Sequence, residues 1–547
     1  MAQTPIIVSW NDTQQHSHSE SLQVHGDPTA DPDAPVVILL HGTNGTIDDM
    51  SNPATHPGWA YDHATPVPSP MPRGVHSYPG IGVWGWALDN PLPPPQGWQP
   101  FLDANGFLTL NYQQTQPAGT LVGPSSTQTA DPVTELDAVV RSTIAAFPGR
   151  RIAFVTHSRG GILLRAWLVA HGHDTAISPH LSRAVMLHAP NQGSDIANIA
   201  VQINAEVSTL ESVVGALPPL QWLSDQTNSP AYPDYEVGSP FLATLAKSEP
   251  VPGIAIDTFG GTSPALTRLH EWVFTVDSLV PTFHVSGFSV TVTFTWSTSD
   301  DPVFGIRTLA NDVSAGVPEL SAGQGDVLVT DKSARLPFST HHSHPVNHAE
   351  ALWDTAVHND GLTVLKAARG APAVTADDCW LTLSNLPARV NPSTAFTVDV
   401  TVANTGTTVL DHTCSFLVDD GHGHATWGSA ATPLSTSISR GHSATVSLSL
   451  TSPAANGAHG LQVRLQRSSP IGHPANASLT VQTQAGLCQQ LASQLQQEQE
   501  AYDLALDQEG EKDSRGHPAF PSAAAHAATA KAAIARIKQQ QAANGCP

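Results

Sequence analysis

A serine between a predicted strand and a predicted helix is the residue in this sequence best suited to nucleophilic chemistry. Residues 152–156 form an unbroken apolar run, and Thr-His-Ser-Arg-Gly at 156–160 joins it to a stretch with helical apolar spacing. A turn this tight strains its middle residue, Ser158, and lifts that side chain above the sheet. Gly160 supplies the small residue needed two positions later, whereas Thr156 stands where glycine is usual. The alternative is that Ser158 only caps the helix.

A serine nucleophile also needs backbone donors for the oxyanion that its attack creates. The apolar run at 36–40 ends in His-Gly-Thr-Asn-Gly at 41–45. A loop of this type after an early strand supplies one donor, and the residue after the nucleophile supplies the other. We therefore predict that the backbone N–H groups of Thr43 and Arg159 form the oxyanion hole. An ordinary turn at a strand end is the alternative for the 41–45 loop.

With these phrases in place, residues 30–370 resemble the bacterial lipases and esterases of the α/β-hydrolase superfamily. Two further runs carry the resemblance: Leu-His-Ala-Pro-Asn-Gln-Gly-Ser at 187–194 and Gly-Ser-Pro-Phe-Leu-Ala-Thr-Leu at 238–245. The resemblance implies a mostly parallel sheet with helices on both faces and a cap insert. It also implies cleavage of carboxylic esters through an acyl-enzyme on Ser158, without a cofactor. Because one fold hosts many chemistries, the resemblance supports the fold more firmly than the substrate.

The resemblance also implies an acid, which must follow the serine in the chain and precede the base. Residues 323–334 resemble the acid loop of the family, and this maps the acid of a Ser-His-Asp triad to Asp326. Asp331 is the nearby alternative. Asp277 is a remoter one that fits better in an inserted hairpin, and a surface turn is the structural alternative for Asp326 itself.

Four histidines in the run at 341–348 are candidates for the base. Residues 346–353 resemble the family segment in which a histidine opens a helix, which maps the base to His348. A metal site is the alternative, since clustered histidines are common ligands. No cysteine lies near and the spacing fits no standard helical pair of ligands, so we expect no metal. His41, His157 and His188 are interpreted as packed or hydrogen-bonded core residues.

The strands and helices that must position these residues fall into three regions with different sequence patterns. From 1 to 372, β-branched runs alternate with helical stretches, which predicts an α/β catalytic domain with a parallel sheet. From 376 to 482, alternating apolar and polar runs predict a small β-sandwich, which loosely resembles immunoglobulin-like accessory domains of exported enzymes. From 486 to 547, a Gln- and Ala-rich composition predicts a hairpin of two helices or a tail.

Within the first region we predict strands at 36–40, 107–111, 152–156, 184–188 and 253–257, and helices at 133–147 and 161–171. Two inserts interrupt this pattern. The one at about 191–250, with an amphipathic helix at 196–207, is expected to form a cap or lid over the serine. The one at about 270–313 is expected to form a β-hairpin. Four tryptophans could line an apolar cleft: Trp84, Trp86, Trp98 and Trp222.

Composition narrows the partners and the compartment. The formal net charge is −23 without a basic cluster, which argues against nucleic acid and anionic membrane as partners. No apolar run is long enough for a transmembrane segment. The four cysteines predict the disulfides Cys379–Cys414 and Cys488–Cys546 and therefore a secreted or periplasmic protein, although no signal peptide is visible in this chain.

The sequence therefore predicts a serine hydrolase that acts on a hydrophobic ester: a lipid, a small ester or a polyester. Two other functions stay open. The chain could be a surface- or polymer-binding protein on a hydrolase scaffold, because about a third of it is non-catalytic in texture. It could also be an acyltransferase that uses the same triad and passes the acyl group to an alcohol or amine.

Overall fold

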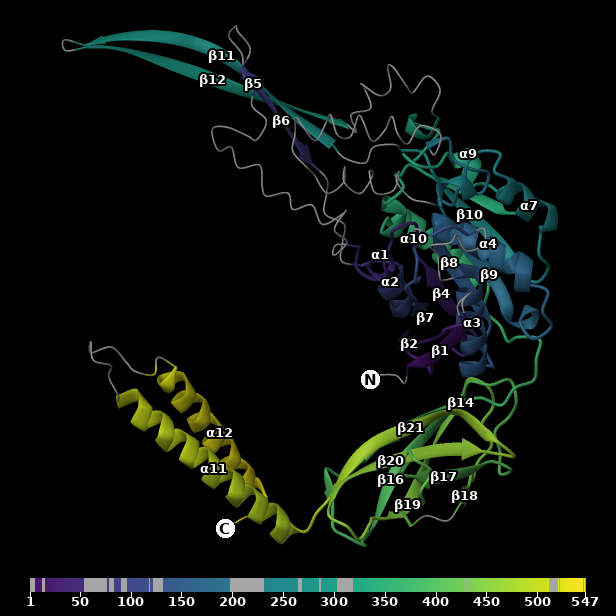
Figure 1. The fold of residues 1–547 in the computed structure, drawn as a ribbon, viewed down its shortest axis with the longest axis vertical. Coiled ribbons are helices and arrows are strands. Elements are labelled where there is room, and N and C mark those ends of the chain that lie inside the picture. Colours follow the sequence, from purple (N-terminus) through teal and green to yellow (C-terminus); the bar gives the residue numbers. More distant parts are fainter. Residues whose placement is uncertain are drawn as a thin grey trace. The chain divides into compact units, whose positions relative to one another are not determined.

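The computed structural model describes residues 5–11, 15–53, 76–77, 83–89, 96–117, 119–121, 131–196, 231–263, 268–284, 287–302, 318–428, 431–510, 520, 522–544 and 546. The chain divides into two compact units (Figure 1). One consists of residues 1–378 and 405–408, and the other of 379–404 and 409–547. Each unit has its own core, and each is described by itself.

A mostly parallel sheet of seven strands organises the first unit, in the order β13-β10-β9-β8-β4-β7-β3. Every neighbouring pair is parallel except β3 with β7. The strands β4, β8 and most of β9 are buried along their length, as expected for a sheet covered on both faces. Their bounds are β3 (Val24–His25), β4 (Val36–Leu40), β7 (Leu108–Asn111), β8 (Ile152–His157), β9 (Leu181–Leu187), β10 (Ala255–Gly261) and β13 (Thr340–His344).

Helices cover both faces of this sheet. On one face, Val155 and its same-side neighbours on the other strands pack against Trp98 of α2 and Leu365 of α10. On the opposite face, the ring of Phe154 lies 5.8 Å from that of Trp167 in α4. The helices of this unit are α1 (Ile47–Ser51), α2 (Trp98–Ala104), α3 (Pro132–Ala146), α4 (Arg159–His171), α7 (Pro240–Ser248), α9 (Asp331–Ala334) and α10 (Thr355–Lys366). The mixed α/β prediction with a parallel-rich sheet is therefore confirmed.

Local sequence explains where the principal helices begin. Asp131 caps α3 by accepting a hydrogen bond from the N–H of Val133, and Pro132 occupies the first position, where its missing N–H costs nothing. Asp354 caps α10 in the same way. Ser158 precedes α4, but its side chain makes no capping bond. The start of α4 is therefore set by something other than a conventional cap.

A separate four-stranded sheet has the order β12-β11-β6-β5. It contains a long antiparallel hairpin of β11 (Arg268–His284) and β12 (Gly287–Pro302), joined to β6 (Val83–Asp89) and β5 (His76–Ser77). Asp277 lies on β11, on the hairpin to which the sequence assigned it. A further pair, β1 (Ile6–Asn11) and β2 (Ser17–Leu22), is antiparallel.

The predicted cleft of tryptophans is wrong for Trp98. Its side chain is fully buried in the core of the first unit, and its Nε1–H donates to the carbonyl of Ala351 at 3.1 Å. Trp84 and Trp86 lie on β6. Trp222 and nearly all of the predicted lid helix at 196–207 lie outside the described residues.

The described part of the second unit contains eight strands and two helices. Strand β16 pairs antiparallel with β14 on one side and with β19 on the other. Strand β14 also meets β21 at a single register pair, Trp380 with His473. The strands are β14 (Cys379–Ser384), β15 (Arg389–Val390), β16 (Ala395–Asn404), β17 (Ser415–Asp419), β18 (Thr432–Pro433), β19 (Ser443–Thr451), β20 (Gly457–Gln466) and β21 (Pro470–Val481). The immunoglobulin-like assignment stays a prediction.

The cysteine predictions have opposite outcomes. Cys488 on α11 (Gln484–Gly510) forms a disulfide with Cys546, which follows α12 (Ala523–Ala543), as predicted. The predicted bond between Cys379 and Cys414 is wrong, because neither cysteine is disulfide-bonded. Both are fully buried in the apolar core of the second unit, and the Cys379 thiol donates to the carbonyl of Ile471 at 3.5 Å. Burial as small apolar side chains accounts for both residues.

Among the described helices, none combines the length and apolar character needed to cross a bilayer.

Candidate active site

Ser158 has the backbone geometry of a strained turn between strand and helix. It follows β8, precedes α4, and has φ 54° and ψ −125°, values that non-glycine residues rarely adopt. Its own N–H donates to the carbonyl of Leu187 at 2.8 Å, which ties the turn to the end of β9. Within residues 152–168 it is the one residue that is not buried. The interpretation as a helix cap fails, and the serine is strained, positioned and accessible.

Small residues let the neighbouring segments approach Ser158 closely. A Cβ on Gly160 would lie 2.6 Å from the carbonyl oxygen of Leu40 at the end of β4. A Cβ on Gly42 would lie 3.0 Å from the Cβ of Ser158, so the loop after β4 passes directly against the serine. Thr156 is accommodated because the residue opposite is Gly161, where an added Cβ would lie 3.3 Å from the Thr156 hydroxyl.

The two predicted oxyanion donors lie on segments that border the serine. Arg159 is the first residue of α4, so its N–H belongs to those without an acceptor inside the helix. Thr43 lies two residues beyond the end of β4, and its hydroxyl is 3.1 Å from that of Tyr235. The structure thus brings both predicted donor residues to the edge of the sheet where Ser158 stands.

A buried polar chain connects these two segments, and the sequence interpretation did not include it. The guanidinium of Arg159 donates to the side-chain oxygen of Gln114 and to the carbonyl of Gly119. Gln114 in turn donates its Nε2–H to the carbonyl of His41 at 2.9 Å, and its backbone N–H to Nε2 of that histidine at 3.2 Å. Gln114 therefore links the start of α4 to the loop after β4 through its side chain.

Burial sets the electrostatics of Arg159. The side chain is fully buried, and this desolvation lowers the pKa of the guanidinium, against the opposing influence of Tyr235 and Tyr112. A buried cation is costly unless its donors are satisfied. The contacts with Gln114 and Gly119 supply two acceptors.

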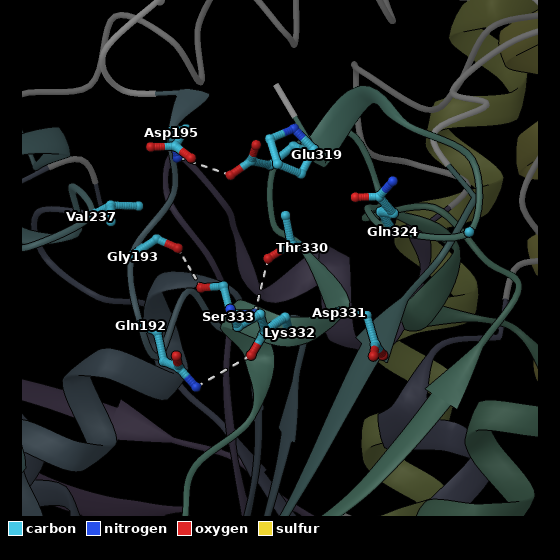
Figure 2. A pocket seen from close by; sticks show the side chains of 12 residues that line it. Gln192, Gly193, Asp195, Val237, Glu319, Gln324, Thr330, Asp331, Lys332 and Ser333 are labelled. Carbon is cyan, nitrogen blue, oxygen red and sulfur yellow. Dashed lines mark hydrogen bonds between the residues drawn. The ribbon is translucent and has the colours of Figure 1, made fainter. Parts of the chain in front are cut away.

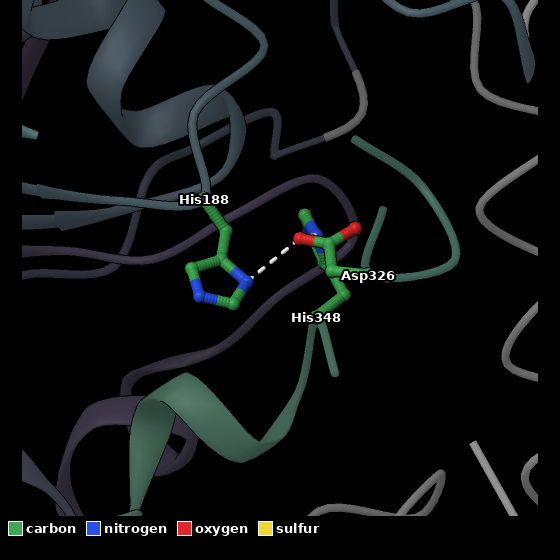
Figure 3. A group of neighbouring side chains, drawn as sticks. All are labelled: His188, Asp326 and His348. Atoms are coloured by element: carbon green, nitrogen blue, oxygen red, sulfur yellow. Dashed lines mark hydrogen bonds and ion pairs between the residues drawn. The ribbon is translucent and has the colours of Figure 1, made fainter. Parts of the chain in front are cut away.

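Asp326 and His348 form a buried pair (Figure 3). Nδ1 of His348 lies 2.9 Å from Oδ2 of Asp326, and the backbone N–H of His348 donates to the carbonyl of the same aspartate at 2.9 Å. The other carboxylate oxygen, Oδ1, accepts the N–H groups of Leu328 at 2.9 Å and Val329 at 2.7 Å. Burial by itself would raise the pKa of Asp326, but the contacts with His348 and His188 outweigh it and hold that pKa well below its usual range.

His348 presents its second ring nitrogen without a partner. Nε2 is buried and has no hydrogen bond to any described residue, Ser158 included. His157, the residue before the serine, bonds through Nε2 to the carbonyl of His348 at 2.8 Å, and the two rings lie 4.8 Å apart. Burial and the neighbouring His348 lower the pKa of His157 well below its usual value, so it is neutral and donates this bond.

The alternative acid and the other histidines have different partners. Asp331 accepts hydrogen bonds from His341 at 2.9 Å and Ser343 at 2.6 Å, and it pairs with Arg335. His342 lies 3.2 Å from Asp257. Three of the four clustered histidines belong to the edge strand β13, which the sequence interpretation did not predict. Of the two nearby candidate acids, the structure places Asp326 against His348.

His188 joins this pair and was interpreted from the sequence as a core residue. It follows β9 directly, and its Nδ1 lies 2.7 Å from Oδ2 of Asp326. The order of the sheet could have identified it, because side chains after the carboxyl ends of neighbouring parallel strands meet at one edge. His188 and Ser158 follow β9 and β8, which are neighbours.

His188, Asp326 and His348 also satisfy a coarse requirement for a metal site, since one donor atom from each lies within 4.8 Å of the others. The separations of 2.7 and 2.9 Å between carboxylate and imidazole are hydrogen-bond distances. Two ligands of a tetrahedral zinc with bonds of about 2.0–2.1 Å would stand roughly 3.3 Å apart. The arrangement therefore fits a hydrogen-bonded cluster better than a metal cage.

A cavity of about 500 Å³ lies beside the acid loop (Figure 2). Its lining comes from the loop after β9 and from residues 318–333, and it includes Asp195 and Glu319. The N–H of Asp195 donates to Glu319 at 2.9 Å, and burial raises the pKa of this glutamate. Because Ser158 and His348 are not among the lining residues, this cavity is not the place where an ester would meet the serine.

Comparisons with known proteins yield structural similarity alone. No protein-family model and no curated protein sequence matches the chain. Among solved structures, the mature form of the Bacillus licheniformis lipase BlEst2 is 17% identical, covers 63% of this chain and 97% of its own, and has a TM-score of 0.36. The carboxylesterase CesB of Bacillus subtilis is 13% identical, with coverages of 67% and 92% and a TM-score of 0.30.

A putative aryl esterase from Burkholderia cenocepacia is also similar, at 14% identity, with coverages of 66% and 98% and a TM-score of 0.27. These identities and TM-scores assign neither a family nor an activity to the chain. What the chain does has to be inferred from the geometry around Ser158.

Proposed function

We propose that this protein is a serine hydrolase of the α/β-hydrolase type that cleaves carboxylic esters through an acyl-enzyme on Ser158. The observation that carries the proposal is the strained, accessible Ser158 between β8 and α4, because its preceding residue, His157, bonds to His348 of the buried pair with Asp326. Strain at a non-glycine residue is costly and persists where the surroundings enforce it, which is common at active sites.

In the proposed first step, Oγ of Ser158 attacks the ester carbonyl carbon while Nε2 of His348 takes the hydroxyl proton. Asp326 holds His348 in the tautomer that leaves Nε2 free to accept, because Nδ1–H donates to the carboxylate. The N–H groups of Thr43 and Arg159 receive the oxyanion. His348 then passes its proton to the leaving alcohol, which departs as the acyl-enzyme forms.

In the second step, water attacks the acyl carbon and gives a proton to His348. The carboxylic acid leaves and Oγ of Ser158 recovers its proton. Hydrogen bonds of a catalytic base often form only with substrate bound, which is compatible with the unpartnered Nε2 of His348. We propose a hydrophobic ester as substrate, with polyester as one member of that class, and export as the setting for the disulfide-bonded chain.

The test is ester turnover by the full chain and by Ser158→Ala. With p-nitrophenyl butyrate we expect turnover by the native chain and a loss of about 10⁴-fold or more in kcat for the variant. Ser51→Ala is the matched control, because the hydroxyl of Ser51 bonds to the carbonyl of Ile47 within α1 and its removal should leave kcat unchanged. A panel from acetate to long acyl chains and solid polyester then defines the substrate.

Two outcomes would contradict the proposal. Turnover that survives in Ser158→Ala would exclude this serine as the nucleophile, and absence of turnover with every ester would favour a binding function. Product analysis with an added alcohol separates hydrolysis from acyl transfer, since a transferase would yield the new ester instead of the acid.

A further inference from the structure

Two backbone N–H groups and two imidazoles surround the carboxylate of Asp326, and His188 supplies one of the imidazoles. Oδ1 accepts two backbone N–H groups, and Oδ2 is approached by Nδ1 of His348 at 2.9 Å and by Nδ1 of His188 at 2.7 Å. An ionised carboxylate has about four lone-pair positions. Three of them accept hydrogen bonds, and the ring of His188 stands beside the fourth.

Among the described residues, Asp326 provides the polar contact of the His188 ring. The side chain is fully buried, and apart from the contact with Asp326 neither ring nitrogen has a hydrogen-bond partner in the part of the chain that the structure describes. Nδ1 of His188 lies within ion-pair distance of Oδ2 without meeting hydrogen-bond geometry, whereas Nδ1 of His348 does form a hydrogen bond with that oxygen. A polar ring buried this deeply is costly unless it is paired, so the carboxylate is what retains it.

The backbone is strained to bring this ring to Asp326. His188 has φ 51°, a left-handed conformation that non-glycine side chains seldom adopt, and its N–H is fixed by a 2.8 Å bond to the carbonyl of Phe259. Gly261 on β10 leaves room for the pair. A Cβ there would lie 2.6 Å from Cε1 of His188 and 2.6 Å from Cβ of Asp326.

We infer that His188 is a positioning residue for the proposed hydrolysis. Nδ1 of His188 lies 2.7 Å from Oδ2 of Asp326, where its N–H can turn to donate beside the bond from His348 and hold the carboxylate in register with that base. The inference rests on the proposed function for its catalytic meaning, although the contact itself does not. Because His188 shares the negative charge of Asp326, it also makes that carboxylate a weaker partner for the imidazolium that forms on His348.

Several charged and titratable groups surround His188. Asp326 and His348 contact it or its carboxylate, and His157 on β8 and His344 on β13 face it with further imidazoles. Glu319 faces Asp326 from the loop before it. A proton on His188 would place a second cation beside His348 when that residue becomes charged during the reaction.

Two substitutions separate a hydrogen-bonding role from packing. His188→Asn keeps a donor near the position of Nδ1, and asparagine tolerates positive φ better than other side chains. His188→Ala has no donor. We expect kcat of His188→Asn to be within about threefold of the native value. We expect His188→Ala to lose on the order of tenfold to a hundredfold in kcat with little change in KM, as misplacement of a catalytic group does.

The pH profile of kcat/KM is the readout that a packing role would not move. Without its second donor, Asp326 supports a more basic His348, so the acid limb should lie at higher pH in His188→Ala and near the native position in His188→Asn. Equal impairment of the two variants would overturn the inference in favour of packing. Native kcat and an unmoved acid limb in His188→Ala would overturn it outright.

Histidine-selective ¹⁵N NMR tests the contact without any substrate. The native protein should show two strongly deshielded Nδ1–H signals, His188→Ala one, and Asp326→Asn neither. One signal in the native protein would overturn the inference even if ester turnover is found. Two signals with no turnover of any ester would keep the contact and reject the proposed function. Two signals that change on addition of EDTA would overturn it in favour of a metal held by the same side chains.

Discussion

At the scale of single residues, the geometry distinguishes candidates that the sequence could only rank. Asp326 lies in the loop before α9 and Asp331, five positions later, is the first residue of that helix, yet Asp326 meets His348 while Asp331 meets His341 and Ser343. The local sequence pattern predicts which residue types occupy the segment that contains the two aspartates. It does not predict the direction in which each carboxylate points, because that depends on β13 and β10, which pair across a long separation in sequence.

Asp326→Asn should lower kcat by roughly 10⁴-fold, because an amide cannot hold His348 in the tautomer that frees Nε2. The substitution is nearly isosteric, so the fold should be retained. Asp331→Asn is the matched control. It should leave kcat near the native value and lower the melting temperature, since Asp331 contacts His341, Ser343 and Arg335. The opposite pattern in kcat would identify Asp331 as the acid.

At the scale of elements, the strands and helices that carry the candidate site were predictable and the connections between them were not. Mainly apolar runs predicted β4 and β8 within one residue of their observed ends, because burial on both faces favours apolar residues along such strands. The edge strand β13 was missed because its residues Thr340–His344 are polar. Gln114 was missed because nothing local to a loop glutamine shows that it bridges two distant segments.

Gln114→Ala should remove the hydrogen bonds that link the loop after β4 to the start of α4. We expect kcat to fall between about ten- and a hundredfold, since displacement of backbone donors weakens oxyanion stabilisation, with KM largely unchanged. Gln192→Ala is the control, because Gln192 bonds only to exposed carbonyls of Lys332 and Arg335 with its side chain. Steady-state kinetics of both variants check this, and equal losses would contradict a specific role for Gln114.

Glu135 on α3 makes stability depend on pH. Burial raises its pKa from 4.5 to about 7, despite hydrogen bonds from Thr115. Because the folded value lies above the unfolded one, the stabilisation is complete below about pH 4.5 and is lost as the pH rises through about 7. Glu135→Gln keeps an acceptor for Thr115 and cannot ionise. Urea unfolding should show the variant more stable than the native protein at pH 8 and similar at pH 4.5, and a constant difference would contradict this.

At the scale of the whole molecule, composition predicted an acidic, folded chain of regions with different texture, and the structure consists of two compact units. Patterns cannot establish long-range covalent pairing, which is why one predicted disulfide is present and the other is wrong. The bracketing of α11 and α12 by Cys488 and Cys546 was a local signal, whereas Cys379 and Cys414 are equally well explained as core residues.

The disulfide should matter for the second unit and not for the candidate site. Cys488 and Cys546 are 58 positions apart, so replacing both by serine should destabilise the segment of α11 and α12 by about 4 kcal/mol on the chain-entropy model. Ester turnover should be unchanged, because Ser158 belongs to the other unit. Circular dichroism melts and kinetics of the double variant test both parts, and a large loss of turnover would contradict the second.

The central claim is that Ser158 is the activated nucleophile, and covalent trapping tests it most directly. Incubation of the full chain with a fluorophosphonate, followed by digestion and mass spectrometry, should locate one adduct on the peptide containing Ser158. The adduct should be absent in Ser158→Ala and strongly reduced in Asp326→Asn. An ester-hydrolysing protein that carries no adduct at Ser158, or carries it on another serine, would contradict the account.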